Sequence, residues 1–72
     1  MKFAIVIGKV GGEFYPDPIY ENIKQLDKKL EYLAEYREKN NMPRVGYIAE
    51  ALTEEREAQH NKEWKQWCSM ID

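Results

Sequence analysis

The stretch KFAIVIGKV, residues 2–10, is dense in β-branched side chains. It is too short for a stable helix and is followed by glycines, so it predicts a β-strand from Lys2 to Val10. Its apolar residues run together instead of alternating with polar ones. Because successive side chains of a strand point to opposite faces, we expect both faces of this strand to be covered.

The residues after this strand predict a hairpin. Gly11 and Gly12 can take the positive φ angles of a tight turn, which would send residues 13–15 back along the first strand. Pro16 and Pro18 end the second strand early. Since a two-stranded ribbon is marginal in water, we expect helices on the sheet and consider a second chain that extends it by dimerisation. The expected fold class is α+β, with two or three helices after the strand or short hairpin.

A long helix is predicted next. Asp17 followed by Pro18 is typical of a helix start, and Asn40 and Pro43 predict an end near Lys39. The apolar residues of this segment step by four, three, four and three and form one narrow stripe: Ile19, Ile23, Leu26, Leu30 and Leu33. We favour packing of the stripe on the chain's own sheet, with a two-chain coiled coil as the alternative. The residues expected in the core or in a dimer interface are Phe3, Ile5, Ile7, Ile23, Leu26, Leu30 and Leu33.

Residues 44–52 fit two interpretations. Four apolar residues have helical spacing, namely Val45, Ile48, Ala49 and Leu52, whereas the RVGYI segment could form a short strand beside the first one. We favour the helix. After it, Thr53 is a suitable N-cap for a final helix with acidic residues in its first turn.

The final helix carries an apolar face on its last two turns. Trp64, Trp67, Cys68 and Ile71 lie at i, i+3, i+4 and i+7, whereas the residues upstream are mainly polar. We therefore expect this helix to be anchored at its end and solvent-exposed along its middle. The expected partner-binding residues are Trp64, Trp67 and Ile71, with Trp64 the more buried of the two indoles and Trp67 the closer partner contact.

Few residues in the chain could perform catalysis. The sequence has one Ser, one Thr, one Cys and one His, and on a helix His60 and Cys68 would stand about 12 Å apart along the axis. We expect Cys68 to be a small buried apolar residue and His60 a surface residue. The glycines of IGKVGG fit neither a dinucleotide fingerprint nor a P-loop. We expect no enzyme activity, no cofactor and no metal.

Composition limits the function classes further. The chain has 72 residues, enough for one small domain over residues 1–72, and a net charge of −2. One cysteine and no long apolar run favour a cytoplasmic protein without a membrane segment or export signal. The acidic balance argues against nucleic-acid binding.

In size and composition the chain resembles the small acidic proteins that phages and bacteria use as inhibitors or adaptors. This likeness, together with the terminal apolar face, predicts a module, expected to be a homodimer, that acts by binding another protein. The alternatives are a nucleic-acid-associated regulator and a small subunit that completes an enzyme site on assembly.

Overall fold

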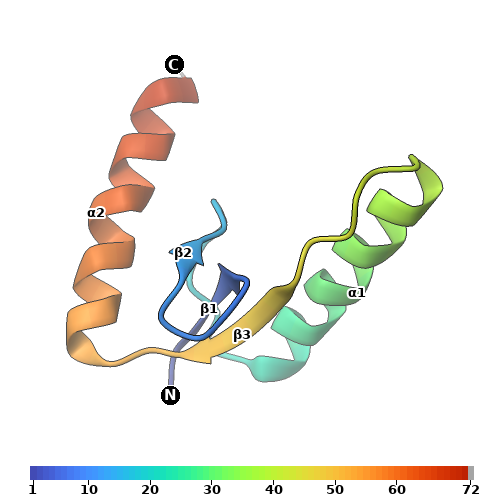
Figure 1. The fold of residues 1–72 in the computed structure, drawn as a ribbon. Coiled ribbons are helices and arrows are strands. Elements are labelled where there is room, and N and C mark those ends of the chain that lie inside the picture. Colours follow the sequence, from blue (N-terminus) through green and yellow to red (C-terminus); the bar gives the residue numbers. More distant parts are fainter. Residues whose placement is uncertain (72) are drawn as a thin grey trace.

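The computed structural model describes residues 1–71, and it gives only the helical position of Ile71. Three strands form one antiparallel sheet in the order β2-β1-β3, and one helix lies on each face of it (Figure 1). The elements are β1 (Phe3–Ile7), β2 (Glu13–Phe14), α1 (Ile23–Lys39), β3 (Tyr47–Ala51) and α2 (Glu54–Ile71). The predicted α+β class is confirmed.

β1 is the central strand and is covered on all sides by its own chain. Ala4, Ile5 and Val6 are almost fully buried, although successive side chains point to opposite faces. β2 pairs with one edge of β1 and β3 with the other. The expected cover on both faces is confirmed, but the strand is shorter than predicted and ends at Ile7. Gly8 follows with φ +86°, a conformation that favours glycine.

The predicted hairpin is confirmed. The turn runs from Lys9 to Gly12, because the Gly12 N–H donates to the Lys9 carbonyl oxygen at 2.9 Å. Of the two glycines expected to take positive φ angles, Gly11 does so, with φ +84°, and Gly12 does not. A Cβ atom on Gly12 would lie 2.6 Å from the backbone oxygen of Ile7, so the turn has no room for a side chain there. The chain after β2 continues along the same edge of β1 as far as Tyr20, whose N–H and C=O both bond to Phe3.

These bonds to Phe3 explain why the predicted helix start at Asp17 is wrong. They tie Tyr20 to the edge of β1 in an antiparallel bridge, so α1 begins only at Ile23 and Ile19 lies outside it. Asn22 caps the helix, because its side chain accepts a hydrogen bond from the Lys24 N–H at 2.9 Å. The predicted end at Lys39 is confirmed.

Residues 44–52 contain a strand, so the favoured helix is wrong. β3 pairs antiparallel with the whole of β1, from Tyr47 opposite Ile7 to Ala51 opposite Phe3. Helical spacing of four apolar residues was outweighed by a full backbone ladder against a central strand. The strand directs Ile48 and Glu50 toward α2, and it directs Tyr47 toward α1.

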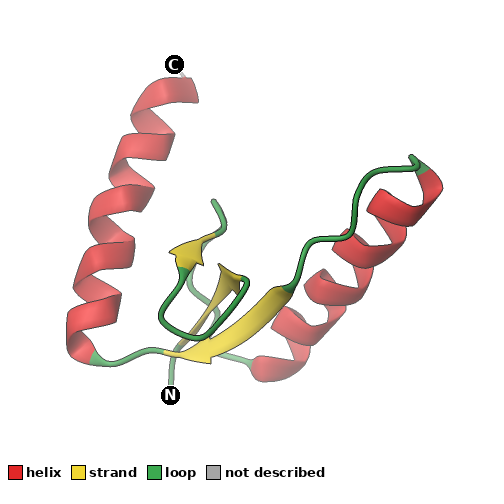
Figure 2. Cartoon of the chain, viewed as in Figure 1, coloured by secondary structure: helices red, strands yellow, loops and turns green. Residues whose placement is uncertain are grey.

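Two apolar clusters therefore fill the two faces of the sheet. Ala4, Val6 and Phe14 form the cluster on the α2 face. The cluster on the α1 face centres on Ile5 and Leu26. Thr53 caps α2 as predicted, because its hydroxyl oxygen accepts a hydrogen bond from the Arg56 N–H. The other end of α2 extends past the strands (Figure 2). Within residues 1–71, neither helix is long and apolar enough to cross a membrane.

Candidate functional site

The residues expected in the core lie at different depths. Ile5, Leu26 and Leu33 are buried between the sheet and α1, and Phe3 and Leu30 pack against them while partly exposed. Ile7 is also partly exposed, at the end of β1. Ile23, the first residue of α1, is 39% exposed. The narrow stripe is thus buried in its middle and open at its first turn.

The two tryptophans are half-buried on the inner side of α2. Their rings meet edge to face with centroids 6.1 Å apart. Trp67, the expected partner contact, is the one that packs on the buried cluster of the α2 face. Trp64 lies one turn before it and faces the His60 ring at 6.2 Å. The side chain of Ile71 lies outside the described residues.

His60 is only 1% exposed, so its expected place on the surface is wrong. α2 turns His60 toward the sheet on the same side as Trp67, and the ring meets Phe14 edge to face at 5.0 Å. Nε2 lies 2.8 Å from the Asp17 carbonyl oxygen, which can only accept, so Nε2 carries the hydrogen. Nδ1 is buried and has no partner among the described residues. The middle of α2 therefore packs on the sheet through His60, whereas we expected it to be solvent-exposed.

Cys68 is exposed, so its predicted burial is also wrong. A helical residue is rotated by about 100° from the one before it. Because Trp67 points at the sheet, Cys68 points sideways from it.

A buried ion pair holds the first turn of α2 against the hairpin. Glu50, which is 3% exposed, accepts hydrogen bonds from Arg56 Nε at 2.8 Å and from the Gly11 N–H. Arg56 also donates to the Gly12 carbonyl oxygen at 2.8 Å, and its guanidinium carbon lies 4.1 Å from the centre of the Phe14 ring. One charged side chain thus joins β3, the hairpin turn and β2 to the helix.

The surroundings of Glu50 keep it ionised. Burial by itself raises the pKa of this carboxyl group. The hydrogen bonds from Arg56 and Gly11 and the positive charge of Arg56 outweigh burial, so the pKa lies below its ordinary value. The pair is a structural clamp whose charges are both satisfied.

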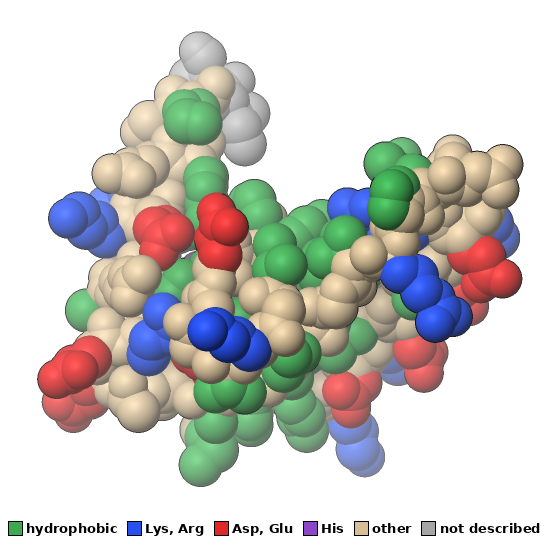
Figure 3. All heavy atoms as spheres, viewed as in Figure 1, with side chains coloured by type: hydrophobic (Ala, Val, Ile, Leu, Met, Phe, Trp, Pro, Cys, Tyr) green, Lys and Arg blue, Asp and Glu red, His purple; other side chains and the backbone are tan. Residues whose placement is uncertain are grey.

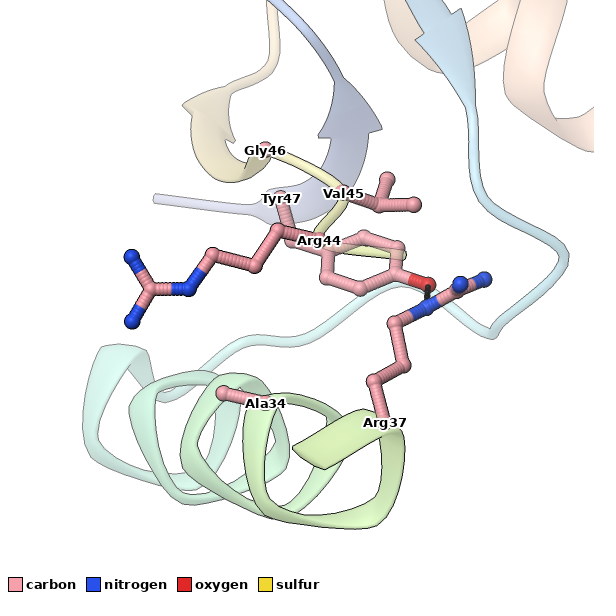
Figure 4. A pocket seen from close by; sticks show the side chains of 6 residues that line it. All are labelled: Ala34, Arg37, Arg44, Val45, Gly46 and Tyr47. Atoms are coloured by element: carbon pink, nitrogen blue, oxygen red, sulfur yellow. Dashed lines mark hydrogen bonds between the residues drawn. The ribbon is translucent and has the colours of Figure 1, made fainter. Parts of the chain in front are cut away.

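A separate pocket with a volume of about 360 Å³ lies where α1 meets the start of β3. Ala34, Arg37, Arg44, Val45 and Tyr47 contribute side chains to it (Figure 4). Arg37 Nε donates to the Tyr47 hydroxyl oxygen at 2.8 Å. The two guanidinium groups reach out on opposite sides of the Tyr47 ring, so they do not converge on one point.

Glu50 and Arg56 were not among the site residues predicted from the sequence. Their signal was present in the strand interpretation of residues 44–52, which places Glu50 on the same face as Ile48. A carboxylate on a buried strand face needs a cationic partner, and Arg56 follows six residues later. Within residues 1–71, no three His, Cys, Asp or Glu side chains gather in a way that could hold a metal ion.

Comparisons with protein-family models, with curated proteins and with solved structures gave no match to this chain.

Proposed function

We propose that the protein acts by stoichiometric association with another protein, as a small inhibitor or adaptor of phage or bacterial type. The observation that carries this proposal is the inner side of the terminal half of α2. Trp64 and Trp67 lie there half-exposed, and the helix continues from them to an end that extends past the strands (Figure 2). Tryptophan is one of the residue types enriched among the side chains that dominate binding energy at protein interfaces.

The neighbourhood of the indoles supports a protein partner. Met70, on the same end of α2, is 78% exposed. Hydrophobic side chains also gather between the two helices on the face seen in Figure 3. An apolar surface with aromatic anchors and a charged rim is typical of the centre and edge of a protein interface.

The proposed role needs no chemistry in the protein itself. His60 is enclosed by Phe14 and the two indoles, and its Nε2 bonds to backbone, so it serves the packing of α2. We place the protein in the cytoplasm, because a single cysteine that is exposed, as Cys68 is, suits a reducing compartment.

Affinity capture from extracts of the native host tests the proposal. The full chain is immobilised as the wild type and as the variants Trp64→Ala and Tyr32→Ala. Tyr32 is exposed on α1 and serves as the matched control. We expect a partner retained in a one-to-one ratio by the wild type and by Tyr32→Ala, and lost with Trp64→Ala, whose circular dichroism should still show a folded protein.

Two results would contradict the proposal: no protein retained in stoichiometric amount, or equal retention by all three chains. Tryptophan fluorescence supplies a second measurement. Single Trp→Phe variants should each show emission quenched by iodide in the free protein and protected from it in the complex.

A second candidate is a nucleic-acid-associated regulator, which the pocket with Arg37, Arg44 and Tyr47 favours. Guanidinium groups beside an aromatic ring can contact phosphates and stack on bases. Binding of single-stranded oligonucleotides that weakens steeply with salt supports this candidate, and absence of binding at low salt removes it.

A further inference from the structure

The outer edge of β3 has no neighbouring strand within residues 1–71. The sheet order puts β3 at one edge, and Figure 1 draws it in front of both helices. Gly46 and Leu52 bond to β1 through their backbone, and bonding residues alternate along an antiparallel ladder. The backbone groups of Tyr47, Ala49 and Ala51 therefore point outward.

This edge lacks the features that usually prevent strand pairing. Proteins protect open edges with proline, lysine, bulges or very short strands. β2 fits that description, since it has two residues and is soon followed by Pro16. β3 has five residues and no proline or lysine, and its one charged side chain, Glu50, is turned inward and buried.

We propose that β3 pairs antiparallel with β3 of a second copy of this chain, about a two-fold axis at Ala49. This register places Ala49 opposite Ala49 and Tyr47 opposite Ala51. It uses all the outward backbone groups of the strand and joins two three-stranded sheets into one. The small side chain of Ala51 leaves room for the Tyr47 ring across the interface.

The charges on either side of β3 fit the same register. It brings Arg44 of one copy to the first turn of α2 in the other, where Glu54 and Glu55 are exposed. Within residues 1–71, none of these three side chains has an ion-pair partner in its own chain. The two-fold axis repeats the contact, so each dimer gains it twice.

In the proposed dimer, one side of α1 also lies near the second copy. A two-fold axis perpendicular to the sheet keeps both α1 helices on the same face. Ile23, Leu30 and Ala34 lie at i, i+7 and i+11 and share one side of α1, and Ala34 borders the start of β3. Ile23 is 39% exposed in the single chain, so the dimer offers it apolar cover.

Sedimentation velocity of the full chain over the micromolar range tests this dimer. Four proteins are compared: the wild type, Arg44→Glu, Arg44→Glu with both Glu54→Lys and Glu55→Lys, and Lys9→Glu. Lys9 lies at the hairpin turn, so its variant makes the same charge change away from the β3 edge. Circular dichroism confirms that each variant is folded.

We expect a wild-type dimer whose dissociation constant rises about tenfold in Arg44→Glu, because repulsion replaces attraction at two symmetric contacts. The combined variant should recover the wild-type value, and Lys9→Glu should not change it. A wild-type monomer throughout the range overturns the proposal, as does a dimer that Arg44→Glu leaves unchanged. The Trp64 surface is not used here, so loss of the dimer and loss of the captured partner are separate results.

Discussion

The two faces of the sheet are held to their helices by different chemistry. α1 packs on its face through buried aliphatic side chains such as Ile5, Leu26 and Leu33. α2 is held by large polar and aromatic side chains, chiefly Arg56, His60 and the indoles, and its backbone approaches the sheet less closely than that of α1. The difference shows that a helix can cover one face of a sheet with a few large polar and aromatic side chains, provided that its buried charges are paired.

The α1 face should be the most sensitive to loss of volume. Leu26 is 0% exposed, so Leu26→Ala should lower the free energy of unfolding by about 2–5 kcal/mol. Tyr32→Ala, at a position of the same helix that is 56% exposed, serves as the control and should cost much less. Urea unfolding followed by circular dichroism measures both. Equal costs would mean that α1 does not bury Leu26 as described.

The α2 face should be sensitive to unpaired charge. Glu50→Leu or Arg56→Leu alone leaves one partner without its counter-charge and should cost about 3 kcal/mol. The double variant removes both charges and should cost clearly less than the sum of the two single changes. A double-mutant cycle by urea unfolding gives the coupling, and additive costs would contradict a direct ion pair.

The contribution of the α2 face to the free energy of unfolding should depend on pH, because Glu50 lies there. The pKa of Glu50 is lower in the folded protein than its ordinary 4.5, so its ionisation stabilises the fold above about pH 4.5. That contribution is lost as the pH falls through the folded-state pKa. The difference in unfolding free energy between wild type and Glu50→Gln should therefore be largest near pH 7 and shrink toward pH 3. A difference that stays the same from pH 7 to pH 3 would contradict a lowered pKa for Glu50.

The smallest effect should come from the exposed pair that joins the start of the chain to α2. Lys2 Nζ lies 2.6 Å from a carboxylate oxygen of Glu57, and hydrogen bonding and charge from Glu57 raise the pKa of Lys2. Because solvent and salt screen such a pair, Lys2→Ala should leave the thermal midpoint unchanged within error. A clear drop would show that α2 depends on this surface contact as well as on its buried clamp.

Local patterns determined several parts of this protein. The unbroken apolar run of β1, the Gly11–Gly12 turn, the end of α1 and the Thr53 cap each depend on neighbouring residues, and each was predictable from the sequence. The middle of the leucine stripe was predictable for the same reason. Of the proposed partner surface, the sequence identified the tryptophans and the face of α2 on which they lie.

Only the tertiary structure decided the remaining features. Residues 17–20 stayed outside α1 because Tyr20 bonds to Phe3, which is distant in the sequence. β3 formed a strand because β1 offered it a full edge, against the helical spacing of its own residues. That pairing turned Glu50 inward, where it could meet Arg56, and the docking of α2 buried His60. Each of these outcomes depends on bonds between distant segments, and the energy of such bonds appears in no local pattern.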